Sequence, residues 1–162
     1  MATIAQVAAG LASVLDDVPG LRVVTFVADD VNPPVAILHL LEVEPETMGR
    51  GISTLTWEAT VLVSRAVDRV GQEALYDYAS LAGTNSVWAA VGHNNTLGLP
   101  DGTQATVMRY RGLGLEELAA YGYYGGVFEI AVTTPAGVAA TTTSASAGVA
   151  TATGAAPNAT AP

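Results

Sequence analysis

The segment from Ile52 to Arg65 constrains the fold of this chain more than any other stretch. Every second residue on one side of it is apolar, namely Leu55, Trp57, Ala59, Val61 and Val63. The residues between them are mostly threonine, with Glu58 and one apolar exception, Leu62. Alternation with a period of two places these two sets on opposite faces of an extended chain. The segment is therefore predicted to be a strand with one buried face.

The predicted strand is long. If all of residues 52–65 are extended, the strand spans about 45 Å, whereas a common strand has about 5–6 residues. We therefore expect it to extend beyond its own domain and to reach a neighbouring subunit, with Leu55, Trp57 and Val61 at the contact. Aromatic residues concentrate at the centres of interfaces, although Trp57 is equally compatible with a role in the core.

Two helices are expected after this strand. Asp68 is a favourable N-cap and Gly83 a favourable residue just beyond the C-terminus of a helix over 68–82. Its apolar stripe consists of Val70, Ala74, Leu75, Tyr78, Leu81 and Ala82. A second, short helix is predicted over 87–91, after the polar residues 84–86.

The N-terminal part predicts a helix and two strands. Thr3 caps a helix over 3–16 with apolar residues at helical spacing. Residues 21–26 are predicted to be a strand. Residues 35–43 are almost continuously apolar, which is typical of a central strand covered on both faces. This strand and the one over 52–65 are adjacent in sequence, which favours a hairpin.

The C-terminal part of the domain predicts two more strands, over 104–111 and 123–132. The residues between them, 112–122, are interpreted as an irregular connection with one helical turn at 115–120. The fold class is therefore α+β, with a mixed or antiparallel sheet of about five strands and the helices packed on one face. Residues 1–132 form this domain.

The character of the chain changes at Thr133. Residues 133–162 contain no charged and no aromatic side chain, so they cannot form a core. We predict an extended C-terminal arm that docks in a groove or on an exposed sheet edge. Its ordering costs about 1 kcal/mol per residue, so the arm is expected to order only in an assembly. Representative docking residues are Thr133, Val138, Val149 and Pro162.

Composition excludes several functional classes. The chain has no cysteine, and its net charge is −9 with only six basic residues, all of them arginine. A nucleic-acid surface needs clustered positive charge, which six scattered arginines do not supply. No apolar run approaches the roughly 18–20 residues of a membrane span. We therefore expect no disulfides and no thiolate metal sites. We also expect no membrane partner.

No combination of residues predicts catalysis. His39 lies in an apolar strand and is expected to be a satisfied histidine of the core or sheet face, while His93 is expected to cap the carbonyls at a helix end. Glu42, Glu44 and Glu46 form a carboxylate cluster at a strand end, where solvated charges are expected. We predict no enzyme activity, no cofactor and no metal.

Several short runs resemble a known family. They are Val63-Ser-Arg, Asp68-Arg, Ala74-Leu-Tyr-Asp-Tyr, Ser86-Val-Trp-Ala-Ala and Thr96-Leu-Gly. Together they resemble the tail terminator proteins of long-tailed bacteriophages, especially those of actinobacterial hosts. The resemblance covers roughly residues 3–132. The turn at residues 97–102 and the C-terminal arm are not part of the matching pattern.

The resemblance implies a structural virion protein of the neck, assembled in the host cytoplasm. Such proteins form a homo-hexameric ring at the head-proximal end of the tail tube, stop tube polymerisation and dock the head-side connector. Genomic DNA passes through the lumen without specific binding. The implied partners are thus the chain itself, the major tail tube protein and the connector or stopper protein.

The lumen is expected to be acidic. Because DNA carries about one charge per 1.7 Å of axis, a negative wall repels it, and the loop over 42–50 is the best candidate. Its charged residues are Glu42, Glu44, Glu46 and Arg50. Two alternatives remain open: a head-side stopper protein, and a small soluble enzyme or binding module.

Overall fold

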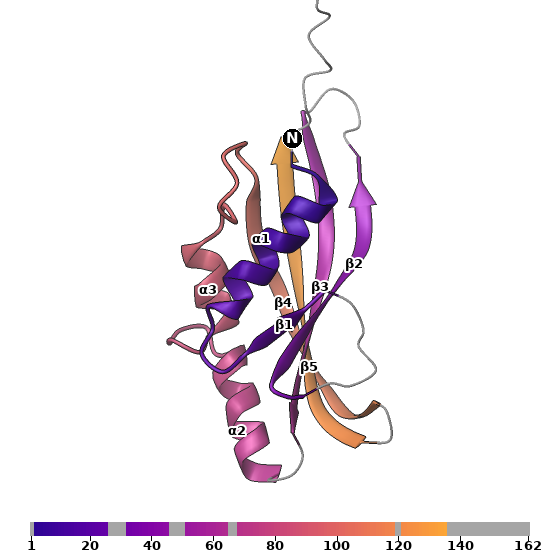
Figure 1. Ribbon diagram of the computed structural model, residues 1–162, viewed down its shortest axis with the longest axis vertical. Coiled ribbons are helices and arrows are strands. Elements are labelled where there is room, and N and C mark those ends of the chain that lie inside the picture. The colour runs from indigo at the N-terminus through magenta and orange to yellow at the C-terminus, as the bar shows by residue number, and fades with distance from the viewer. Residues whose placement is uncertain (1, 26–31, 46–50, 65–67, 119–120, 136–162) are drawn as a thin grey trace, which may run out of the picture.

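The fold is described from a computed structural model, which covers residues 2–25, 32–45, 51–64, 68–118 and 121–135. Within these ranges the chain forms α1 (Ile4–Asp16), β1 (Arg22–Val24), β2 (Val35–Glu44) and β3 (Ile52–Ser64). It continues with α2 (Asp68–Ala79), α3 (Val87–His93), β4 (Gln104–Leu118) and β5 (Tyr121–Pro135). Figure 1 shows these elements on one elongated body.

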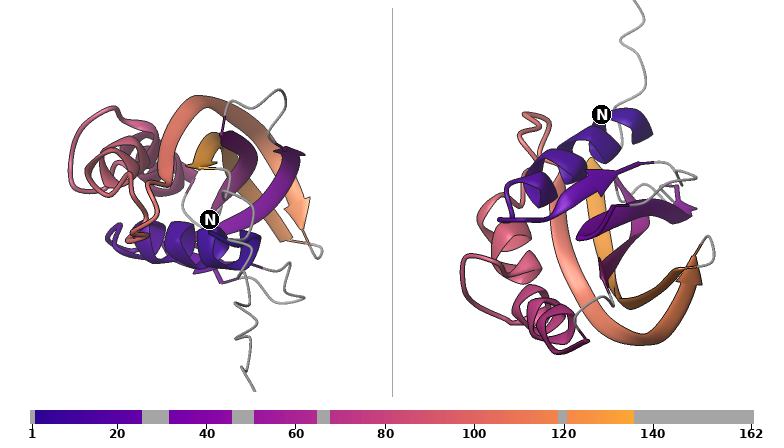
Figure 2. Two further views of the ribbon diagram at one scale, coloured as in Figure 1. Left: turned by 90° about the horizontal axis from the view of Figure 1, so that it is seen from above. Right: turned by 60° about the horizontal axis from the view of Figure 1, so that its bottom comes forward.

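The strands form one five-stranded sheet in the order β1-β2-β3-β5-β4. β1 pairs with β2 in parallel, and all other neighbours are antiparallel, so the sheet is mixed. The three helices lie on one side of the sheet, as the view from above shows (Figure 2). These observations confirm the predicted α+β class and the β2–β3 hairpin.

The hydrophobic core lies between the sheet and the helices. The alternating apolar residues of β3 are buried, as predicted, and pack with Phe128, Ile130 and Val132 of β5 in the core on the helical side of the sheet. Leu62, the exception in the alternation, lies on the opposite face in a small cluster with Val35 and Tyr123. Each face of the long strand therefore has apolar contacts within the same subunit.

Local sequence signals explain where α1 and α3 begin. The Thr3 hydroxyl accepts a hydrogen bond from the Gln6 amide at 3.2 Å, and the Gln6 side chain accepts one from the Thr3 amide at 2.8 Å. This reciprocal capping box satisfies two amides that the first turn leaves without helical partners. At α3, the Ser86 hydroxyl accepts from the Ala89 amide at 3.1 Å and so caps that helix.

The prediction that β3 extends past its own domain is wrong. β5 pairs with every residue of β3 from Ile52 to Ser64, so the length of β3 is matched inside its own sheet. β4 and β5 contradict a second prediction, the irregular connection over 112–122. β4 continues to Leu118 and β5 begins at Tyr121, which leaves no room for a helical turn at 115–120.

Two other boundaries also differ from expectation. Residues 133–135 belong to β5, where Thr134 is buried, so the domain ends later than residue 132. α2 ends at Ala79 rather than at residue 82, and Leu81 is exposed. β2 is not covered on both faces either, because its residues from His39 onward are mostly exposed. Several apolar residues of β2 instead lie on a surface that the other described elements do not cover.

Candidate functional site

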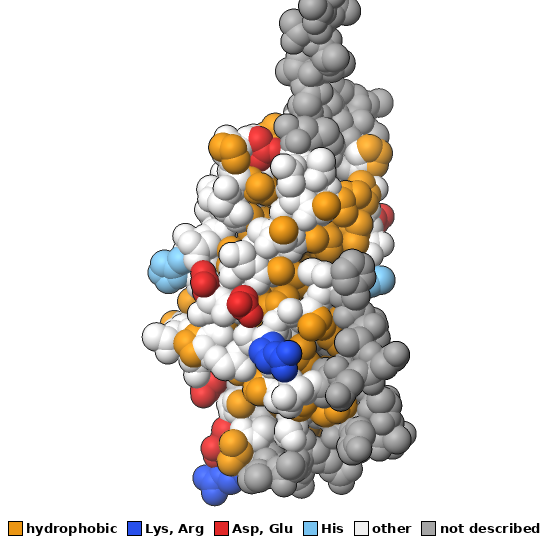
Figure 3. Space-filling view, in the orientation of Figure 1, with side chains coloured by type: hydrophobic (Ala, Val, Ile, Leu, Met, Phe, Trp, Pro, Cys, Tyr) orange, Lys and Arg blue, Asp and Glu red, His pale blue; other side chains and the backbone are white. Residues whose placement is uncertain are grey.

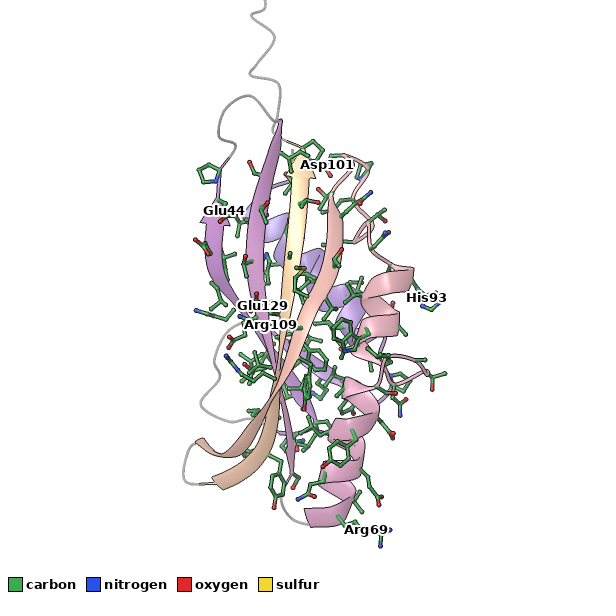
Figure 4. The ribbon with its side chains drawn as sticks, turned by 180° about the vertical axis from the view of Figure 1, so that it is seen from behind. Glu44, Arg69, His93, Asp101, Arg109 and Glu129 are labelled. Carbon is green, nitrogen blue, oxygen red and sulfur yellow. The ribbon has the colours of Figure 1, made fainter. Side chains whose placement is uncertain are left out.

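The helix-free face of the sheet carries a row of polar residues across four strands. His39 of β2 is paired with Glu58 of β3, Glu58 with Glu129 of β5, and Glu129 with Arg109 of β4. Figure 4 shows Arg109 and Glu129 together in the middle of this face. The Arg109 Nε donates to Glu129 Oε2 at 2.7 Å. The Thr60 hydroxyl donates to Glu58 Oε1 at 3.3 Å.

This row balances charges that would otherwise repel. Two glutamates directly opposite on neighbouring strands destabilise a sheet, and Glu58 and Glu129 are such a pair. Arg109 offsets one of them through its ion pair. The other β3 residues of this face are mostly threonine, whereas Leu62 packs in a small apolar cluster with Val35 and Tyr123. Near its centre the face is therefore polar and carries more acidic than basic groups.

The predicted lumen residues lie only partly within the described chain. Glu42 and Glu44 are exposed and are paired with Thr56 and Thr54, so they share the helix-free face with Glu58. Glu46 and Arg50 lie outside the described residues. Glu58 and Glu129 were not among the predicted lumen residues. Only the register of β3 against β5 brings them together, although the alternation already placed Glu58 on the polar side.

The predicted subunit contact at Leu55, Trp57 and Val61 does not fit the structure. Their side chains are 4%, 4% and 0% exposed in a single chain, where they belong to the main core. Such residues retain almost no surface for a neighbour. We therefore correct their assignment from interface to core.

Apolar side chains are exposed elsewhere, at the end of the molecule where β2 stops. We call this surface the apolar strip; it consists of Ile4 and Ala8 of α1 and of Leu40 and Val43 of β2, with Leu41 at the bulge between Leu40 and Glu42. Ile4, Leu41 and Val43 are 47%, 49% and 45% exposed. Figure 3 shows hydrophobic side chains gathered between α1 and the upper half of β2. The strip is open because β1 has only three residues and pairs only with residues 35–37.

A separate depression of about 670 Å³ lies between the end of α1, the segment after α2, and α3. Its lining includes Asp17, Leu81 and His93. The His93 Nδ1 lies 2.6 Å from the carbonyl oxygen of Ala89, in line with the predicted capping role. Across the described ranges, no three histidine, aspartate or glutamate side chains are placed to hold a metal ion.

The perturbed titratable groups have structural causes. A hydrogen bond from the Thr103 hydroxyl lowers the pKa of Asp101, with a further contribution from the Thr103 amide. Burial raises the pKa of Tyr78, and the Asp77 charge adds to this effect. Burial also raises the pKa of Tyr110, which packs on Phe128 with ring centroids 4.8 Å apart. These groups are not grouped around the depression.

The predicted docking arm is mostly outside the described chain. Thr133 is not part of an arm, because it belongs to β5 and is paired with Thr54. Val138, Val149 and Pro162 lie beyond the last described residue. The last described residue, Pro135, ends β5 beside Ile52.

Comparisons with known proteins do not assign a family: no protein-family model matches the chain, and no curated protein is significantly similar to it. None of the helices in the described ranges is long and apolar enough to cross a membrane.

Proposed function

We propose that this chain is a structural virion protein, the tail terminator of a long-tailed bacteriophage. In this proposal it forms a homo-hexameric ring at the head-proximal end of the tail tube. The ring stops polymerisation of the tube protein and presents a docking surface to the head-side connector. DNA passes through the lumen without specific binding.

The observation that carries this proposal is the position of the residues that resemble the family. They occupy the end of β3, then α2, α3 and the turn after α3, in one continuous order. Several of them, including Val63, Tyr78 and Val87, are buried. The resemblance is thus based on residues that determine packing, which is what a shared fold requires.

One surface property also supports the proposal. The acidic sheet face favours passage of DNA over adhesion, because phosphates are attracted by clustered positive charge. Of the arginines within the described ranges, Arg69 and Arg109 are paired with Glu73 and Glu129. Pairing weakens their attraction for phosphate.

The test is deletion of the gene from its phage, followed by electron microscopy of the tails. A terminator limits tube growth, so the deletion is expected to give tails longer than the wild-type length, and complementation should restore it. Fractionation supplies the second readout. The chain should remain with tails in particles that lack heads. Recovery with tailless heads, together with normal tail length, would favour the stopper alternative and contradict the proposal.

A further inference from the structure

The outer edge of β2 is only partly occupied. β1 pairs with Val35, Ala36 and Ile37, and no described strand pairs with the outer edge of residues 38–44. An unpaired edge presents a row of amides and carbonyls that can accept another strand. Here the open edge lies beside the apolar strip, whose side chains a new strand would cover.

We propose that the occupant of this edge is the C-terminal segment of this chain itself, residues 136–162, added as a strand antiparallel to residues 38–44 of β2. This inference goes beyond the proposed function and does not depend on it, and it replaces the expectation that the segment orders only in an assembly. It concerns a docking site for a segment that follows directly on β5.

The first argument is position. Glu44 is paired with Thr54 and Thr54 with Thr133, so the end of β2 and the end of β5 lie on one row of the sheet. α1 also begins at this end of the molecule (Figure 1). The segment thus starts at the same end of the molecule as the strip. From β5 to a strand outside β2 there are three strand spacings, which is about 14 Å and needs about five extended residues.

The second argument is direction. β2 and β5 are both antiparallel to β3, so they run the same way. A chain that leaves the end of β5 and turns over the end of the sheet must return in the opposite direction. It would therefore pair with β2 in the antiparallel sense, which is slightly more stable per residue than the parallel one.

The third argument is chemistry. The edge carries Glu42 and Glu44. Because the chain as a whole is acidic, a whole second domain docked at this edge would place more negative charge beside these two glutamates. Residues 136–162 have no charged side chain, and no proline occurs before Pro157. Alanine and threonine are their commonest residues, with only two valines; the β-branched threonines favour a strand, and the small alanines add no steric obstacle to pairing. These small side chains can contribute little binding free energy, so the main-chain hydrogen bonds to the edge of β2 would supply most of the affinity.

The test uses cross-linking in the full chain, which has no cysteine of its own. Val43→Cys is combined in turn with Thr142→Cys, Thr143→Cys and Ser144→Cys, and disulfide yield is measured under mild oxidation. Because neighbouring residues of a strand face opposite sides, the yield should alternate along the three positions. Val70→Cys is the matched control, because Val70 is also exposed but lies on α2 at the other end of the molecule.

We expect yields at Val43→Cys several times higher than at Val70→Cys. The mass of the product shows whether the segment comes from the same subunit or from a second copy, and either product places residues 136–162 on the strip. Equal yields at the two sites, without alternation, would overturn the inference.

Hydrogen exchange gives an independent measurement without introduced cysteines. Removal of residues 136–162 keeps every described element, and amide exchange in β3 checks that the sheet remains intact. The outer amides of residues 38–44 should exchange about tenfold faster or more in the shortened chain. Unchanged exchange in residues 38–44, with β3 still protected, would mean that another element covers the edge or that nothing does.

Discussion

At the scale of single residues, Asp101 fixes the turn that leads into β4. The buried Thr103 donates to Asp101 Oδ1 twice, from its amide at 3.1 Å and from its hydroxyl at 2.6 Å. These bonds lower the pKa of Asp101 in the folded state. A lowered pKa contributes stability above the unfolded-state pKa of about 3.9, and this contribution disappears as the pH falls through the folded-state pKa.

Asp101→Asn should therefore be less stable than the wild type at neutral pH, and the difference should shrink in acid. Thermal unfolding of both proteins at pH 7 and at progressively lower pH measures this. Asp77→Asn, on the exposed side of α2, is the control with the same chemical change. A pH-independent difference for Asp101→Asn would show that the charge on the carboxylate is unimportant.

A second residue-scale prediction concerns Gly126, which lies beneath the ring of Tyr110. A Cβ at this position would overlap the Tyr110 ring, and the ring cannot move freely because it packs on Phe128. Gly126→Ala should destabilise the protein by about 1–3 kcal/mol through overpacking. Gly92→Ala in α3 is the control, since its added methyl meets open space. Urea unfolding should show little loss, or a gain, for the control.

At the scale of elements, Ser86 joins the segment after α2 to the start of α3. Its hydroxyl donates to the carbonyl of Ser80 and accepts from the amide of Ala89, and the side chain is 1% exposed. Ser86→Ala leaves the Ser80 carbonyl and the Ala89 amide without this partner, so a loss of about 1–3 kcal/mol is expected. Ser13→Ala, on the exposed side of α1, should be neutral in the same denaturant titration. Equal losses for the two variants would contradict the bridging role.

At the scale of the whole molecule, the proposed function makes the acidic sheet face a channel wall. Glu42→Lys combined with Glu44→Lys would turn that wall locally positive and attract the DNA backbone. Genome ejection from phage carrying this double variant should be slower, and the effect should weaken at high salt. Ejection can be followed by the release of dye-stained DNA from single particles.

The control for this prediction makes the same charge change on the helical side. Asp16 and Asp17 are exposed at the end of α1, so Asp16→Lys with Asp17→Lys adds equal charge away from the sheet face. Ejection from this phage should resemble the wild type. If both double variants slow ejection equally, the sheet face is not the wall of the channel.

The sequence alone determined the helices and strands of this protein, because helix capping and apolar periodicity depend only on residues close together in the chain. The capping residues Thr3 and Ser86 predicted two helix starts, and the alternation in residues 52–64 predicted both the strand and its buried face. From these elements the α+β class and the one-sided helices followed. The pattern around Glu58 also indicated a polar face, since period two needs no knowledge of neighbouring strands.

Only the tertiary structure decided what those elements contact. Whether Trp57 meets a neighbour or its own core depends on the pairing of β3 with β5, which brings together residues about 70 positions apart along the chain. Residues 112–122, with glycines at 112, 114 and 122, were predicted to be an irregular connection, yet pairing between β4 and β5 makes this region a hairpin. The outer edge of β2 is open because β1 is too short to pair with all of it. Long-range pairing, rather than local preference, determines which apolar residues remain exposed.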